Sequence, residues 1–147
     1  IRCPYLGTTF NKFRRIFIME ERVSFEVAML AKKVNFNKPC THIYEKDEDI
    51  FELPYYIGDN GKVDNSEIIT EEELYPTYAC TAPSQAVLSK WLREVVRVFI
   101  SVVTEKEDAH HVVAIQGDNV IIEEEGFETY EEALEKGLKE VLKHIQE

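Results

Sequence analysis

The segment from residue 81 to residue 104 passes directly from a helical pattern of apolar residues into a strand pattern. Thr81 is positioned to cap the helix, and Pro83 suits its first turn, where the N–H that proline lacks would be unpaired anyway. Apolar residues then recur at the i, i+3, i+4 spacing of one helix face, and these are Val87, Leu88, Trp91, Leu92 and Val95. We therefore predict a helix over residues 84–96 and expect Trp91 to anchor the core.

From residue 98 to residue 103 the chain is almost continuously β-branched or aromatic. Such a run is typical of a strand that is largely buried on both faces. Two further strands are predicted over residues 111–116 and 120–125. The Gly-Asp-Asn turn at residues 117–119 joins them, because Gly and Asn tolerate the positive φ of tight turns. The pattern thus predicts three consecutive antiparallel strands.

The cleanest amphipathic pattern in the chain lies over residues 130–145. Thr129 and Glu132 form a capping box, T-x-x-E, at the start of this predicted helix. Gly137 falls within the apolar stripe, although a glycine inside a helix costs about 1 kcal/mol relative to alanine. We expect close packing of the helix against the sheet to be the reason for this glycine.

The first half of the chain is less regular and richer in acids and tyrosines. Pro54 indicates an edge strand or an irregular one, because proline cannot donate a ladder hydrogen bond. The predicted elements are a helix over residues 25–34 capped by Ser24, strands over residues 41–46 and 50–57, and one short helical turn within residues 68–75.

Together the pattern predicts a single α+β domain over residues 19–147. Residues 81–147 carry the order helix, three strands, helix (αβββα), with both helices on one face of an antiparallel sheet. The strands of the first half could extend the same layer, which gives a sheet of three to five strands.

The composition fits a folded domain, since 44% of the 147 residues are apolar. No apolar run reaches 18 residues, so neither a transmembrane helix nor membrane association is expected. The cysteines, Cys3, Cys40 and Cys80, are odd in number and show no CxxC spacing. A disulfide framework is therefore not expected, and a reducing cytoplasm is the expected location.

Charge is distributed unevenly along the chain. Residues 1–18 carry four bases and no acid, whereas residues 19–147 carry 13 bases and 28 acids, a net charge of −15. Met19 opens a segment that resembles a natural start, so residues 1–18 are expected to be a non-native or disordered basic tail; a transit peptide is the alternative. The acidic body disfavours phosphate backbones and favours a basic protein partner.

No catalytic, cofactor-binding or metal-ligating residues are assigned from the sequence. A cryptic enzyme site could be built around Cys40 and His42, but no third metal ligand follows in pattern. His110 and His111 would point to opposite faces of a strand, which makes them a poor chelating pair. The acids at residues 123–125 alternate in the same way and are interpreted as a solvated strand edge.

Two resemblances are local: the first is one of topology, and the second is one of a short motif. The αβββα order resembles that of double-stranded-RNA-binding domains, but Thr129-Tyr130-Glu131-Glu132 stands where those domains carry a basic cluster. The segment EEEGFETYEEALEKGLKEVLKHI (123–145) resembles the last strand and helix of HicB-type antitoxins. Only topology is implied by the first resemblance, because fold alone does not fix function.

A wider resemblance rests on the segments SFEVAMLAKKVNFNKPC (24–40), APSQAVLSKWLREV (82–95) and FETYEEALEKGLKEVLK (127–143). They are similar to a family of small hypothetical proteins encoded in prophages and mobile elements of gut bacteria. The resemblance implies a start near Met19 and implies no catalytic residues.

The expected function is that of a non-enzymatic accessory or interaction protein of a phage or mobile element. Two alternatives stay open: an enzyme with a cryptic site near Cys40 and His42, and an acidic DNA mimic or HicB-antitoxin-like inhibitor. No nucleic-acid binding by residues 19–147 is expected. The last helix offers only a short basic row among glutamates, in which pairs such as Glu132–Lys136 and Glu135–Lys139 would occupy the lysines.

Overall fold

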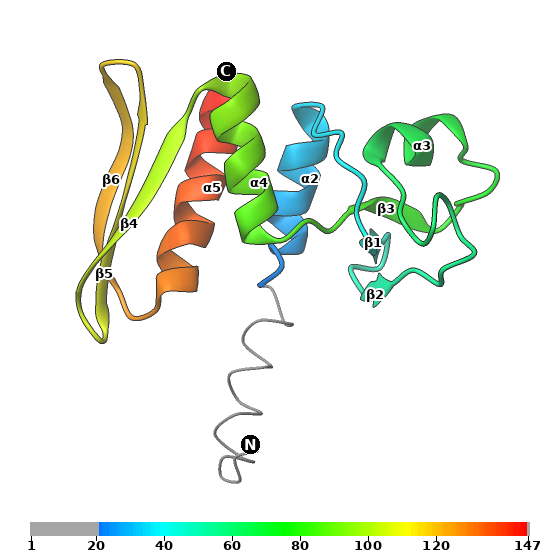
Figure 1. Cartoon of the computed structure of the whole chain (residues 1–147), viewed down its shortest axis with the longest axis horizontal. Coiled ribbons are helices and arrows are strands. Elements are labelled where there is room, and N and C mark those ends of the chain that lie inside the picture. Colours follow the sequence, from blue (N-terminus) through cyan, green and yellow to red (C-terminus); the bar gives the residue numbers. More distant parts are fainter. Residues whose placement is uncertain (1–20, 147) are drawn as a thin grey trace, which may run out of the picture.

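The computed structural model describes residues 21–146, so the expected tail over residues 1–18 lies outside the described part of the chain. None of the described helices is long and apolar enough to cross a membrane. The elements, in chain order, are α2 (Phe25–Lys33), β1 (His42–Glu45), β2 (Ile50–Glu52), α3 (Asn65–Thr70), β3 (Tyr78–Thr81), α4 (Gln85–Trp91), the π-helical turn η2 (Leu92–Val96), β4 (Phe99–Lys106), β5 (Ala109–Gln116), β6 (Asn119–Phe127) and α5 (Tyr130–Gln146) (Figure 1).

The predicted α+β fold is confirmed. The strands form two three-stranded antiparallel sheets, in the orders β2–β1–β3 and β4–β5–β6. Helices α4 and α5 lie on one face of the β4–β5–β6 sheet, and α5 contacts all three of its strands (Figure 1). Trp91 and Leu138 belong to one core cluster, and the ring of Trp91 meets Phe36 edge-on with centroids 5.3 Å apart. Trp91 is therefore the expected core anchor.

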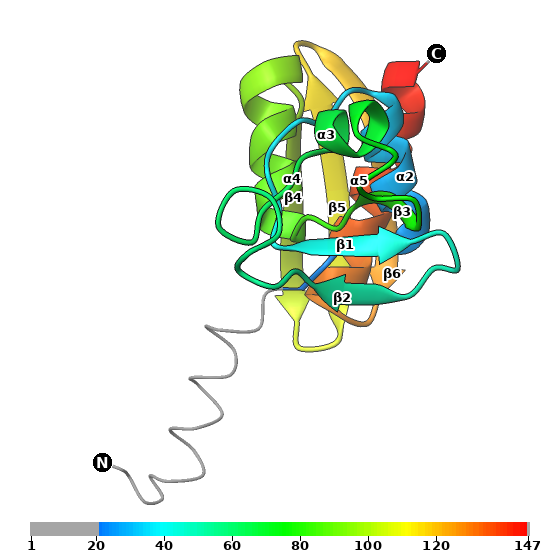
Figure 2. The ribbon, with the colours of Figure 1, turned by 90° about the vertical axis from the view of Figure 1, so that its right-hand side faces the viewer.

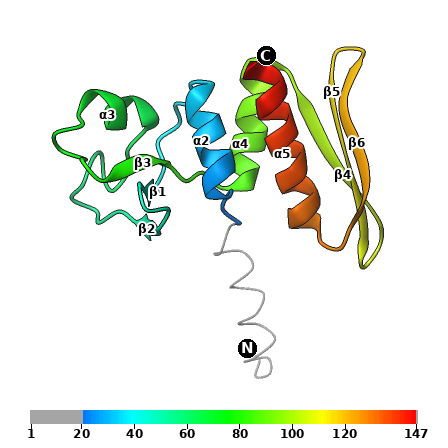
Figure 3. The same cartoon turned by 180° about the vertical axis from the view of Figure 1, so that it is seen from behind.

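The strands of the first half do not extend the C-terminal sheet. The β2–β1–β3 sheet lies beyond α2, at the opposite end of the molecule, as Figures 1 and 3 show from two sides; Figure 2 looks onto it. Ile43 on β1 packs in a separate cluster with Leu53, Val63 and Ile68, whereas its neighbour Tyr44 packs in the main core. The centre of this sheet is thus buried on both faces.

The helix after β3 begins later than predicted. Ser84, not Thr81, is the N-cap of α4, and its Oγ accepts from the N–H of Val87 at 3.1 Å. Thr81 instead ends β3, a strand that the pattern did not predict. The predicted helix over residues 84–96 does reach Val96, but its last turn is π-helical.

The prediction that residues 98–103 form a strand buried on both faces is wrong. Val98 is fully buried, but Phe99 and Val103 are 45% and 44% exposed. The reason is that helices cover only one face of the described sheet, so alternate side chains of β4 face away from the core. This uncovered surface of β4, β5 and β6 is called the outer face below.

Gly137 lies where α5 approaches the sheet most closely. A Cβ atom built on Gly137 would lie 2.7 Å from Cγ2 of Val112 and 3.1 Å from Cγ2 of Ile100. Both distances are shorter than ordinary van der Waals contacts. The expected reason for this glycine, close packing against the sheet, is confirmed.

Candidate functional site

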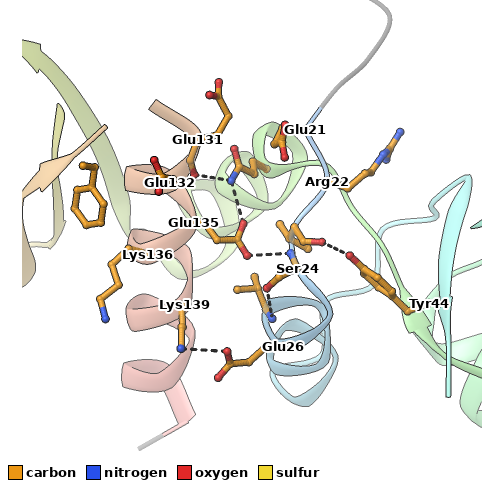
Figure 4. Close-up of a pocket in the computed structure, with 14 residues that line it drawn as sticks. Glu21, Arg22, Ser24, Glu26, Tyr44, Glu131, Glu132, Glu135, Lys136 and Lys139 are labelled. Carbon is orange, nitrogen blue, oxygen red and sulfur yellow. Dashed lines mark hydrogen bonds and ion pairs between the residues drawn. The ribbon is translucent and has the colours of Figure 1, made fainter. Parts of the chain in front are cut away.

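A groove with a volume of about 590 Å³ lies between the start of α2 and the first turns of α5 (Figure 4). Acids gather at this end of α5 because carboxylates are stabilised by the positive end of the helix dipole. The charged lining residues are Glu21, Glu26, Glu131, Glu132, Glu135, Arg22, Lys136 and Lys139.

The polar groups of this groove bond largely to one another. Glu135 accepts from the Ser24 N–H at 2.9 Å and from the Gln85 amide at 3.0 Å, which ties α2 and α4 to α5. Lys139 lies 3.1 Å from Glu26. The Ser24 hydroxyl accepts from the Val27 N–H as the cap of α2. The groove is therefore built as a joint between helices, and its serine is engaged in capping.

Cys40 and His42 do not form a reactive pair in the described structure. The Cys40 thiol is buried, and this burial raises its pKa to about 11. Its hydrogen bond is to the Lys38 carbonyl at 3.5 Å, while His42 Nδ1 lies 2.9 Å from the Thr41 hydroxyl. Burial also lowers the pKa of His42. A protonated thiol without an adjacent base is a weak nucleophile.

The adjacent histidines point to opposite faces of β5, as predicted. His110 faces inward, where Nδ1 lies 2.8 Å from the Thr104 hydroxyl and Nε2 donates to the Glu107 carbonyl at 3.2 Å. His111 lies on the outer face together with Glu105 and Glu125, and one ligand atom from each of these three lies within 4.8 Å of the others. Sequence reasoning missed this trio, because its members come from three strands and meet only through the strand register.

The outer face also carries a row of apolar side chains. Phe99, Ile115 and Val120 stand opposite one another across β4, β5 and β6. They are 45%, 39% and 59% exposed, and no helix of the described chain lies over them (Figure 1). Val103 continues the apolar surface along β4 toward the Glu105, His111 and Glu125 trio. The face is thus apolar at one end and acidic at the other.

The lysines of α5 are paired with carboxylates, but not in the pairs that the sequence indicated. Lys136 and Lys143 lie 3.4 Å and 4.0 Å from Glu140, and Lys139 lies 3.1 Å from Glu26 on α2. The i, i+4 spacing did not reveal the contact with α2, because that contact depends on helix packing. The basic row is therefore largely occupied by neighbouring acids.

We expect a chain that starts at Met19 to show no binding to duplex DNA or RNA at ~0.15 M salt. Duplex affinity depends on several lysines or arginines that neutralise phosphates, and the lysines of α5 are already paired. Fluorescence anisotropy with labelled 20-base-pair DNA and RNA duplexes of mixed sequence measures this directly. Saturable binding in the micromolar range would show that the acidic body does not exclude phosphate backbones.

No protein-family model, curated protein or solved structure matches this chain. The function is therefore inferred from the surfaces of the molecule. The polar groups of the α2–α5 groove bond largely to one another, whereas no element of the described residues 21–146 covers the apolar and acidic side chains of the outer face.

Proposed function

We propose that the protein is a non-enzymatic interaction protein, an accessory protein of a phage or mobile element, that binds a basic partner protein through its outer face. The observation that carries this proposal is the exposed row of Phe99, Ile115 and Val120 on an uncovered sheet. The mobile-element setting rests on the resemblance of the three sequence segments described above.

The apolar row favours association because its members adjoin one another. Single exposed apolar residues are common on protein surfaces. Side chains that face each other across neighbouring strands, however, lie about 5 Å apart and form one patch. Contiguous apolar patches of this kind are typical of interaction sites, and each Å² that a partner removes from water contributes roughly 25 cal/mol. Phe99 is the largest side chain of the row and the only aromatic one, so it offers the most apolar surface for such burial.

The charges beside this patch indicate the chemistry of the partner. Glu105, Glu123 and Glu125 lie toward the other end of the outer face, and residues 19–147 carry a net charge of −15. A partner with apolar side chains flanked by lysine or arginine would complement both ends. Opposite charges also accelerate the encounter of two proteins.

The acidic inhibitor remains a narrower form of the same proposal. Glu123 and Glu125 are exposed on the outer face of β6 and would suit a cationic groove of a nucleic-acid-binding protein. The enzyme alternative gains less support, since burial raises the pKa of the Cys40 thiol to about 11 and so works against formation of a thiolate nucleophile.

Site-specific photo-crosslinking tests the proposal. A photoreactive amino acid at position 120 of the full chain, expressed in its native host, is expected to give one adduct whose linked peptide is rich in lysine or arginine. The same probe at position 46, on the turn between β1 and β2, is the matched control and is expected to give none.

The purified adduct protein then has to bind the unmodified chain. The variants Phe99→Ser and Val120→Ser are each expected to weaken that binding about tenfold, since truncation of an interface anchor commonly costs more than 1 kcal/mol. Val87→Ser, an exposed apolar position on α4, is expected to leave it unchanged. Equal binding by Phe99→Ser, or an adduct consisting only of a second copy of this chain, would contradict the proposal.

A further inference from the structure

We propose that the acidic end of the outer face is a Zn²⁺ site whose ligands are Glu105, His111 and Glu125. Each residue comes from a different strand, and the three ligand atoms already lie within 4.8 Å of one another. Imidazole nitrogen and carboxylate oxygen are both common zinc ligands, and three protein ligands with one open position are typical of zinc sites that exchange a water or bind another group.

The distance between the ligand atoms of His111 and Glu105 fits a shared ion better than a direct hydrogen bond. Nδ1 of His111 lies 3.4 Å from Oε1 of Glu105. An N–H···O hydrogen bond is usually 2.7–3.2 Å long. Two ligands that are each about 2.1 Å from zinc and subtend a tetrahedral angle are about 3.4 Å apart. The spacing of the pair is one that a shared tetrahedral ion would accommodate, and it also lies within the range of a direct ion pair.

Apart from the Glu105 carboxylate at 3.4 Å, the Nδ1 atom of His111 has no polar partner in the described structure. Nδ1 of His111 is shielded from solvent and makes no hydrogen bond in the described structure. The neighbouring His110, by contrast, has both ring nitrogens bonded to protein groups. Buried polar atoms are nearly always hydrogen-bonded, so an imidazole nitrogen that faces two carboxylates without such a bond needs an explanation. A bound cation would supply the missing partner.

Two irregularities in the sheet bring the carboxylates to this histidine. The register of β4 against β5 shifts at Glu105. The register of β6 against β5 shifts opposite His111, where Glu125 and Gly126 occupy the space of one residue. Gly126 has a φ of 92°, which glycine adopts without a steric penalty. β-Bulges redirect side chains and recur beside functional sites, and here one flanks the histidine on each side.

The ligand set selects the class of metal. One imidazole and two carboxylates suit Zn²⁺ and related transition-metal ions, whereas Mg²⁺ and Ca²⁺ prefer sites made entirely of oxygen. Glu123, which lies on the same face of β6, adds negative charge near the site without belonging to the trio. We therefore expect zinc to bind more tightly than magnesium or calcium.

Isothermal titration of the full chain with ZnCl₂, MnCl₂, MgCl₂ and CaCl₂ tests the site. A Cys3→Ser background removes a thiol that could bind zinc independently. One zinc ion per chain is expected, bound at least about 100-fold more tightly than magnesium or calcium. His111→Ala and Glu125→Gln are each expected to weaken zinc binding by more than the roughly 10–100-fold that loss of an outer-shell partner causes.

Two matched variants test whether zinc binds at this site or merely to acidic and histidine side chains elsewhere on the surface. Glu123→Gln removes a carboxylate from the same face, and His144→Ala removes an exposed histidine from α5; both are expected to keep parental zinc affinity. A shift of the His111 imidazole resonances on addition of one equivalent of zinc gives a second readout. Zinc binding that is equal in His111→Ala and the parent would overturn the proposal, as would the lack of any binding below about 100 μM. The titration needs no partner protein, so its outcome is independent of the proposed interaction.

Discussion

Replacing Gly137 with valine is expected to lower the free energy of unfolding by about 3 kcal/mol, the upper part of the range for overpacked cores. Gly137 and the facing Val112 are both buried, and even a Cβ atom would lie 2.7 Å from Val112. Helix α5 would have to move off the sheet to make room. A β-branched residue recovers only part of the roughly 1 kcal/mol that glycine costs inside a helix. The melting temperature should fall by about 10 °C, as circular dichroism can measure.

A double-mutant cycle with Val112→Ala isolates the contact. Val112→Ala alone is expected to destabilise the protein through the cavity that it leaves. In the double variant the new valine can enter that space. The double variant is therefore expected to lose less free energy of unfolding than the two single variants lose together, by about 1 kcal/mol or more. Lys143→Val places the same β-branched residue at an exposed position of α5, away from the contact with Val112. If Gly137→Val is no less stable than Lys143→Val, the packing argument fails.

The features that the sequence predicted well are local. Ser24 caps α2, and Thr129 caps α5 by accepting from the Glu132 N–H at 3.1 Å; both signals lie within three residues of the group they satisfy. Gly137 was informative for a similar reason, because a glycine in an otherwise good helix points to a close neighbour. The αβββα order followed from such signals and from the short turn at Gly117.

The features that the sequence did not predict depend on distant parts of the chain. The apolar run of β4 could not show whether one face or two would be covered, since that depends on where the helices pack. Strand β3 pairs with β1 across more than 30 residues, with Cys80 opposite Tyr44. The Glu105, His111 and Glu125 trio requires a register shift on either side of β5, and no local pattern encodes such a shift.

Cys40 and Cys80 are expected to be among the least reactive groups of the folded protein. Burial raises their pKa values from 9.0 to about 11 and about 12. At pH 8 the thiolate fraction, and with it the alkylation rate, should therefore fall about 100-fold for Cys40 and about 1000-fold for Cys80. Because these pKa values are higher in the folded protein than in the unfolded chain, folding favours the protonated thiols. Their contribution to stability is fully present below pH 9 and is lost as pH rises toward 11 and 12.

Iodoacetamide labelling at pH 8, followed by peptide mass spectrometry, measures both rates. The Cys3→Ser variant restricts the signal to the two described thiols, and the same protein in 8 M urea provides the unfolded reference rate. Because both thiols are buried, the need for the protein to open can slow labelling further, so the two values are the smallest protection factors expected. Native labelling of Cys40 within tenfold of the urea rate would show an accessible, ionised thiol beside His42. That result would contradict the buried environment described here and would favour the enzyme alternative over the interaction protein.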